Sequence, residues 1–177
     1  GDAAFLQEHL DVIRVFTIAP EEPGNLDCIR EMAGKCLISM GHTAATYAQA
    51  VAGIEAGVRH VTHLFNAQTP LSHREPGVVG AALTDDRVSC ELIADTFHGT
   101  IAGSVLKMNE AVRNLLSNTA LAPWEAVNAA SLTPAKRIGV DGTKGSLDVG
   151  KDADIVLCDQ RFEVLRTIVG GRTVYAR

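Results

Sequence analysis

Three histidines of this 177-residue sequence give the clearest indication of a chemical function: His42, His63 and His98. Each comes at or near the end of a short apolar, strand-like run. Imidazole is the commonest protein ligand for Zn²⁺ and related ions, and a catalytic metal site keeps one position open for water. One such histidine alone is more often a structural residue, but three at equivalent strand ends favour a metal-dependent active site.

The runs that precede these histidines are predicted to be strands of one parallel sheet. Residues 12–19, 36–40, 58–65 and 88–94 are rich in β-branched or other apolar side chains, and helix-length segments separate them. Strands in such strand–helix repeats run parallel, and the active sites of these folds lie at the carboxyl ends of the strands. We therefore expect the three imidazoles to share one edge of the sheet.

The remaining periodicities predict further helices and strands along the whole chain. Residues 45–56 form an Ala-rich helix, for which Thr43 is the predicted N-cap and Gly57 the stop, and a loop covers residues 70–77. The other predicted helices are 25–33, 105–116, 123–130 and 134–138, and the other predicted strands are 153–158, 164–169 and 173–175, the last two joined by a Gly170-Gly171 hairpin turn.

Two further polar residues each have two interpretations. His60 lies three residues before His63 and so faces the opposite side of an extended strand, where it either packs in the core or supports the site. Arg74 lies in a charged loop, where it either binds an anion through paired hydrogen bonds or forms a surface salt bridge with Glu75 or Asp85. Without further context, core packing or a helix contact is the favoured interpretation of His60, and a surface salt bridge is the favoured interpretation of Arg74.

Composition narrows the class of protein. Sixteen Lys and Arg against 21 Asp and Glu give a formal net charge of −5, so nucleic acid and anionic membranes are poor candidate partners. No apolar run reaches the ~18 residues of a membrane span. The four cysteines show no CxxC spacing, so we expect reduced thiols and a cytoplasmic protein.

Four segments, taken together and in order, resemble the N-acetylglucosamine-6-phosphate deacetylases of the amidohydrolase superfamily. They are Gly-His-Thr-Ala-Ala-Thr at 41–46, Thr-His-Leu-Phe-Asn-Ala at 62–67, Arg-Glu-Pro-Gly at 74–77 and Ile-Ala-Asp-Thr-Phe-His at 93–98. The resemblance implies an α/β fold that is part of a (β/α)8 TIM-like metal-dependent hydrolase barrel. It assigns residues 1–144 to the partial barrel and residues 145–177 to strands of a small β-sandwich domain.

The resemblance also implies a reaction, the hydrolysis of the N-acetyl group of N-acetylglucosamine 6-phosphate to glucosamine 6-phosphate and acetate. His42 and His63 resemble the two imidazole ligands of a divalent metal ion, for which zinc is the first choice and iron, manganese or cobalt are alternatives. The metal would activate a water for attack on the acetamide carbonyl. His98 resembles the residue that helps to polarise that carbonyl.

Expectations about substrate and partners come from the same resemblance. Asn66 and the backbone at Ala67 resemble part of the sugar-phosphate pocket. Arg74 resembles a phosphate clamp that reaches across a homodimer interface into the neighbouring site. The expected partners are therefore a small-molecule sugar phosphate and a second copy of the chain, with neither nucleic acid nor membrane.

The chain is short for this family, because a (β/α)8 barrel alone takes about 250 residues. By the resemblance, it lacks an amino-terminal part with a metal-ligand glutamate, and a segment near residues 98–100 with an acid/base aspartate. If the 177 residues are the ordered parts of a longer protein, we expect a chain break or an implausible span between His98 and Thr100. A fragment and a homologue that lost these segments are the alternative explanations.

Two other functions stay open at this point. Another amidohydrolase that acts on a cyclic amide would share the fold, although it would have no need of Arg74 as a phosphate clamp. An inactive fragment or scaffold would be consistent with the missing glutamate and aspartate, because neither has a replacement in the sequence.

Overall fold

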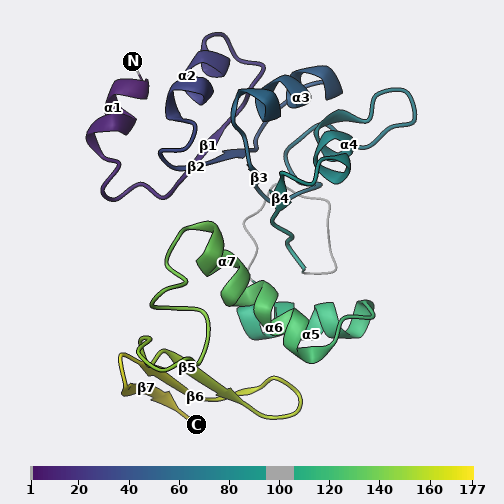
Figure 1. Ribbon diagram of the computed structural model, residues 1–177. Coiled ribbons are helices and arrows are strands. Elements are labelled where there is room, and N and C mark those ends of the chain that lie inside the picture. The colour runs from purple at the N-terminus through teal and green to yellow at the C-terminus, as the bar shows by residue number, and fades with distance from the viewer. Residues whose placement is uncertain (1, 95–105) are drawn as a thin grey trace. The chain divides into compact units, whose positions relative to one another are not determined.

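The computed structural model describes residues 2–94 and 106–177 of the chain, and Figure 1 shows the helices and strands that they form. These residues form two compact units: one contains the described residues up to Ile93, and the other contains Ala94 and the described residues from Leu106 to Arg177. In chain order the elements are α1 (Asp2–Glu8), β1 (Val15–Ile18), α2 (Asn25–Met32), β2 (Leu37–Met40), α3 (Tyr47–Ala56), β3 (His60–Val61), α4 (Gly77–Thr84), β4 (Ser89–Cys90), α5 (Met108–Asn118), α6 (Pro123–Ala130), α7 (Leu132–Arg137), β5 (Ile155–Cys158), β6 (Val164–Val169) and β7 (Arg172–Ala176).

The first unit is a parallel sheet with helices packed in chain order. Its four strands lie in the order β1-β2-β3-β4, and every neighbouring pair is parallel. Helix α1 packs against α2, α2 against α3, and α3 against α4, and Figure 1 shows these helices side by side along the sheet. The predicted alternation of parallel strands and helices is confirmed.

The core of this unit lies between the sheet and the helices. Its largest fully buried apolar side chains are Ile29, Met32, Ile38, Met40, Ile54, Val58, Val61, Val78 and Val79. Helix α4 is buried over most of its length and apolar throughout. The sequence analysis predicts no helix there, because a uniformly apolar segment lacks the 3.6-residue alternation that marks a half-buried helix.

Strands β3 and β4 are shorter than predicted. The sequence predicts a strand over residues 58–65, whereas β3 contains only His60 and Val61. The backbone leaves the extended conformation soon afterwards, with φ of +35° at His63 and +77° at Phe65, both in the left-handed region. Strand β4 likewise ends at Cys90 rather than at residue 94.

Helix α3 begins at a different cap from the predicted one. Thr46 is the N-cap: its hydroxyl accepts a hydrogen bond from the Gln49 amide at 3.3 Å, and the Gln49 side chain accepts one from the Thr46 amide at 2.9 Å. The prediction of Thr43 as N-cap is wrong, because the helix begins only at Tyr47; the Thr43 hydroxyl donates to the Glu21 carboxylate at 2.5 Å. Gly57 ends the helix as predicted, with φ of +138°.

The second unit contains three helices and an antiparallel sheet of three strands in the order β5-β6-β7. Pro123 occupies the first turn of α6, and Gly170 and Gly171, both with positive φ, form the turn between β6 and β7. Both features agree with the sequence. Helix α5 is tied to the loop between β5 and β6 by Arg113, which pairs with Glu163 at 2.9 Å. A domain boundary between residues 144 and 145 stays a prediction.

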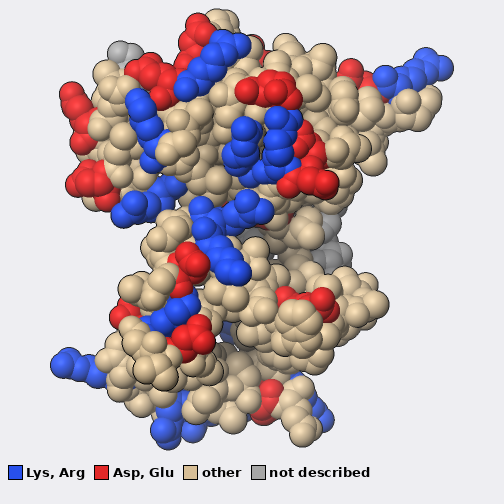
Figure 2. Space-filling view, viewed as in Figure 1, with Lys and Arg blue, Asp and Glu red and all other residues tan. Residues whose placement is uncertain are grey.

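Acidic and basic side chains are intermingled over the face seen in Figure 2, as the near balance of charges in the sequence suggests. None of the helices formed by the described residues is long and apolar enough to cross a membrane. None of the four cysteines, all of which lie in the described residues, forms a disulfide.

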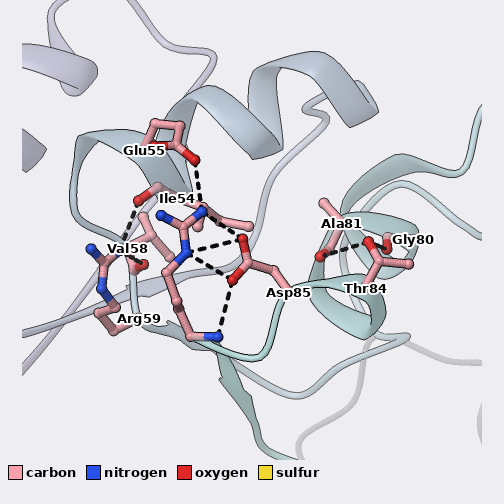
Figure 3. A network of polar contacts seen from close by, with 9 residues as sticks. Ile54, Glu55, Val58, Arg59, Gly80, Ala81, Thr84 and Asp85 are labelled. Atoms are coloured by element: carbon pink, nitrogen blue, oxygen red, sulfur yellow. Dashed lines mark hydrogen bonds and ion pairs between the residues drawn. The ribbon is translucent and has the colours of Figure 1, made fainter.

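An ion network ties the residues that precede β3 and β4 to the end of α3, and Figure 3 shows it from close by. Arg87 donates through Nε to the two Asp85 carboxylate oxygens at 2.9 and 3.2 Å, and through Nη2 to Glu55 at 2.6 Å. The Arg59 guanidinium donates to the carbonyl of Ile54 at 2.7 Å, in the last turn of α3. The network therefore stabilises the edge of the sheet opposite the one that carries the predicted site.

We predict that the Asp85–Arg87 pair makes stability depend on pH in the acid range. Hydrogen bonds from the Arg87 side chain and amide lower the pKa of Asp85 from 3.8 to about 2. Because the folded-state pKa lies below the unfolded value, the stabilisation is complete above 3.8 and disappears as pH falls through about 2. Asp85→Asn should therefore lower the melting temperature by a few degrees near neutral pH, and this difference should shrink on acidification. A difference that stays constant down to pH 2 in thermal melts would contradict the assignment.

Candidate functional site

Two of the three predicted histidines lie together at the carboxyl ends of neighbouring strands. Strands β2 and β3 pair in parallel with Met40 opposite Val61, and His42 and His63 each follow two residues later. Their side chains converge, with 3.0 Å between the two Nε2 atoms and 4.7 Å between ring centroids in an edge-on arrangement. The parallel register therefore brings the imidazoles together although 21 residues separate them in sequence.

The hydrogen bonding of His63 prepares one ring nitrogen to bind a cation. Its Nδ1 lies 3.0 Å from the backbone carbonyl oxygen of Asn66, which can only accept, so Nδ1 carries the proton. The neutral ring then has its lone pair on Nε2, the atom that faces His42. A carbonyl that holds the distal N–H is the usual support of a metal-bound imidazole. The pair therefore fits two ligands of a divalent metal ion.

The loop after β3 folds back onto the turn that carries His42. The Thr43 amide donates to the carbonyl of Ala67 at 3.1 Å, which joins the two turns directly. His42, His63 and Ala67 all have positive φ, at +50°, +35° and +49°. Non-glycine residues adopt this conformation rarely, and mostly at turns and functional sites. The structure thus brings the predicted pocket residues Asn66 and Ala67 beside the histidine pair.

A hydroxyl cluster packs the strand ends beneath the pair. The Thr62 Oγ1 lies 2.6 Å from the Ser39 hydroxyl and 3.2 Å from the Thr17 hydroxyl, so three neighbouring strand ends are joined by side chains. Gly41 lies against the same threonine, and a Cβ at position 41 would lie only 2.9 Å from the Thr62 Cβ. Glycine is therefore required for this close approach, immediately before His42.

His60 is buried in a polar contact rather than among apolar side chains. It is 7% exposed, its Nδ1 lies 2.7 Å from the Ser89 hydroxyl, and its Nε2 lies 3.0 Å from the Glu91 carboxylate. The hydrogen bond from His60 lowers the pKa of Glu91 from its ordinary value. The other Glu91 oxygen accepts from the His63 amide at 3.4 Å. Of the two interpretations of His60, support of the site is therefore favoured.

Sequence reasoning missed Glu91 and Glu21, which both contact the histidine-bearing turns. Glu91 was detectable as a lone carboxylate in an otherwise uncharged strand-like run, residues 88–94. Glu21 follows the first predicted strand as closely as His42 follows the second, at the same edge of the sheet. An inspection of every polar residue after each strand, rather than of histidines alone, would have found both.

Arg74 lies exposed in the loop before α4. The carboxylates considered as its surface partners bind other groups: Asp85 pairs with Arg87 at 2.6 Å, and Glu75 accepts from the Tyr47 amide at 2.6 Å. An interaction of Arg74 with an anion is thus compatible with its surroundings.

The third histidine, His98, lies outside the described residues, as does the chain break predicted between His98 and Thr100. Within residues 2–94 and 106–177, no three His, Cys, Asp or Glu side chains are grouped closely enough to hold a metal ion. The described part of the chain therefore offers a pair of metal ligands, His42 and His63, rather than a complete set.

Curated proteins with related sequences share one chemistry. The chain is 34% identical to N-acetylglucosamine-6-phosphate deacetylase of Bacillus subtilis (strain 168), over 96% of this chain and 56% of that protein. It is also 34% identical to N-acetylgalactosamine-6-phosphate deacetylase of Escherichia coli O157:H7, over 90% of this chain and 56% of that protein. The first alignment runs over 223 positions, more than the 177 of this chain, so the relative contains several tens of residues without a counterpart here.

Solved structures of the same class have the same fold over nearly all of this chain. N-acetylglucosamine-6-phosphate deacetylase from Pasteurella multocida superposes with a TM-score of 0.87 at 29% identity, covering 98% of this chain and 59% of that one. A mutant of the Mycobacterium smegmatis enzyme, in complex with N-acetyl-D-glucosamine-6-phosphate, gives 0.87 at 27% identity and covers 98% of this chain and 62% of that one. The fold is therefore part of the (β/α)8 TIM-like barrel with strands of a small β-sandwich domain, as the sequence predicts.

The chain spans little more than half the length of these relatives. A profile of the amidohydrolase family matches residues 71–174, which is more than half of the sequence and includes the loop with Arg74, α4 and most of the second unit. The parallel sheet and the histidine pair agree with this match. The chain therefore belongs to the amidohydrolase family.

Proposed function

We propose that this chain provides part of the active site of a metal-dependent deacetylase that converts N-acetylglucosamine 6-phosphate to glucosamine 6-phosphate and acetate. The observation that carries the proposal is the convergence of His42 and His63, with their Nε2 atoms 3.0 Å apart at the carboxyl edge of a parallel sheet. The deacetylases among its relatives and structural neighbours support this reaction over others of the family.

His42 and His63 would hold the metal ion through their Nε2 atoms. When bound, a divalent ion polarises the carbonyl under attack and lowers the pKa of a water molecule toward neutrality. The chain's own contribution is to orient the ligands: the Asn66 carbonyl fixes the His63 tautomer, and left-handed backbone at both histidines turns the rings toward each other. Zinc is the first choice, with iron, manganese or cobalt as alternatives, because nitrogen and oxygen sites accept all of them.

The substrate's phosphate and acetamide would contact different parts of the chain. In this proposal, Asn66 and the Ala67 backbone line the sugar-phosphate pocket beside the histidine pair, and His98 polarises the acetamide carbonyl. Arg74 binds the phosphate, reaching across a homodimer interface into the neighbouring site. Its exposed position, with Glu75 and Asp85 engaged elsewhere, supports an interaction with an anion.

The complete reaction also needs a third metal ligand and an acid/base, for which the resemblance to the family points to a glutamate and an aspartate outside this sequence. We therefore propose that deacetylation belongs to a protein that supplies both. The cytoplasm is the proposed compartment, because the four widely spread cysteines have no CxxC spacing in the sequence. N-acetylgalactosamine 6-phosphate is a second candidate substrate, because an equally similar relative is named for it.

Substrate class can be tested on a protein that contains this chain together with the two carboxylates. We expect acetate release from N-acetylglucosamine 6-phosphate and little from unphosphorylated N-acetylglucosamine, since the phosphate provides binding energy that the free sugar lacks. N-acetylgalactosamine 6-phosphate, measured in parallel, decides between the two sugar phosphates. Equal rates with phosphorylated and unphosphorylated sugars would exclude a phosphate-dependent deacetylase, and turnover of cyclic amides alone would favour the other amidohydrolase function.

Removal of either imidazole should weaken metal binding. His42→Ala and His63→Ala should each lower the affinity for Zn²⁺ by more than roughly 100-fold, because loss of even an outer partner of a ligand costs 10–100-fold. Competition with a chromophoric chelator measures this affinity, and His73→Ala, a change at an exposed histidine, is the matched control. Affinities that are equal for all three variants would show that the pair holds no metal.

Replacement of Arg74 should affect substrate binding more than turnover. Arg74→Ala removes charge-assisted hydrogen bonds worth about 1.5–3 kcal/mol, so kcat/KM should fall roughly 10- to 100-fold, mainly through a higher KM. The phosphate does not react, so kcat should change little. Steady-state kinetics with and without the 6-phosphate measure both effects, and an unchanged preference for the phosphorylated sugar would refute the clamp.

A further inference from the structure

Two carboxylates flank the histidine pair from the outer strands of the sheet. The strand order places β1 and β4 outside β2 and β3, which carry the histidines. Glu21 follows β1 and Glu91 follows β4, both at the carboxyl edge where His42 and His63 lie. Each histidine-bearing turn thus borders an outer strand that is followed by a carboxylate residue.

Glu21 holds the turn that follows His42. One of its carboxylate oxygens accepts from the Thr43 hydroxyl at 2.5 Å, and the other accepts from the Ala44 amide at 2.6 Å. The Thr43 hydroxyl oxygen in turn accepts from the Ala45 amide at 3.1 Å. Because one carboxylate fixes the two residues that follow His42, these contacts help His42 to keep its left-handed φ of +50°.

Glu91 holds the turn that contains His63 with both its backbone and its side chain. The Glu91 amide donates to the Val61 carbonyl at 2.9 Å, and the Glu91 carbonyl accepts from the Leu64 amide at 2.8 Å. Between these two, the carboxylate accepts from the His63 amide at 3.4 Å. The buried His60 ring, 3.0 Å from the other carboxylate oxygen, keeps the side chain in this position.

We propose that Glu21 and Glu91 are positioning residues that hold the two turns so that the Nε2 atoms of His42 and His63 converge on one divalent cation. The inference rests on the proposed function for the cation, but the hold on the two turns is independent of it. Ligand geometry must be kept within about 0.5 Å for a site to work. Left-handed backbone at a histidine is unfavourable, so surrounding contacts must maintain it, and these carboxylates supply contacts of that kind.

The test compares alanine and glutamine variants of the full chain. Glu21→Ala and Glu91→Ala remove the acceptors, whereas Glu21→Gln and Glu91→Gln keep an amide oxygen that can accept the same amide hydrogen. Glu55→Ala is the matched control, since it removes an exposed carboxylate with an ion pair at the opposite edge of the sheet. Two readouts are measured for each variant: the Zn²⁺ affinity by chelator competition, and the hydrogen exchange of the Ala44 and His63 amides without metal.

We expect Glu21→Ala to increase the exchange rate of the Ala44 amide roughly 10-fold or more, with a smaller effect on the His63 amide. Glu91→Ala should have the opposite pattern, with the larger increase at the His63 amide. Zn²⁺ affinity should fall roughly 10- to 100-fold in both. The glutamine variants should recover most of the exchange protection and affinity. Glu55→Ala should lower the melting temperature without changing either readout.

The proposal would be overturned by unchanged exchange of both amides in the alanine variants, or by the same loss of Zn²⁺ affinity in Glu55→Ala. If circular dichroism shows that an alanine variant is unfolded, the corresponding glutamine variant is used as the test. In that variant, exchange of the Ala44 amide (Glu21→Gln) or the His63 amide (Glu91→Gln) as fast as in an unfolded chain would contradict the positioning role. If the unsubstituted chain binds no Zn²⁺, the proposed metal function fails, whereas the amide exchange still decides whether the two carboxylates hold the turns.

Discussion

The parallel pairing of β2 with β3 is the constraint on which the candidate site depends. With Met40 opposite Val61, residues 42 and 63 are level, and a slip of one residue would send one imidazole to the other side of the sheet. The Thr62 hydroxyl, bonded to both Ser39 and Thr17, opposes such a slip from within the strands. Because this register joins residues 21 positions apart, the closeness of the two imidazoles follows from strand pairing and not from their spacing along the chain.

The two edges of this sheet carry different kinds of polar group: ion pairs at the amino edge, and the histidine pair of the candidate site at the carboxyl edge. At the amino edge, charged groups pair with one another around Arg87, where solvent access makes each pair modest in strength. At the carboxyl edge, carboxylates accept hydrogen bonds from backbone amides and a hydroxyl, so these charged groups fix the conformation of turns rather than pair one element with another. Parallel strands generally divide in this way, since their carboxyl ends face the active site.

The order of strands and helices, the edge that carries the site and the place of His42 and His63 could be predicted from the sequence, because period-2 and period-3.6 patterns are local. Predictions from local patterns failed where a residue forms a hydrogen bond with a partner far away in the sequence. Thr43 is a good N-cap by type, yet its hydroxyl bonds to Glu21 and the cap is Thr46. The strand over residues 58–65 ends early, because His63 turns left-handed beside Glu91. Helix α4 left no periodic signal because it is apolar on every side.

The two carboxylates that hold the histidine-bearing turns do not complete a metal site: in the described part of the chain, no three His, Cys, Asp or Glu side chains are grouped closely enough to hold an ion. A third ligand needs a lone pair directed at the metal, and an acid/base needs a carboxylate free to exchange protons with substrate. Both Glu21 oxygens already accept short hydrogen bonds from Thr43 and Ala44, and Glu91 is held between His60 and the His63 amide. In the proposed function, the missing groups would come from the carboxyl ends of other strands, as barrel enzymes gather catalytic residues from several strands. In that proposal, the sheet described here contributes the two imidazoles, and its own carboxylates hold the turns that carry them.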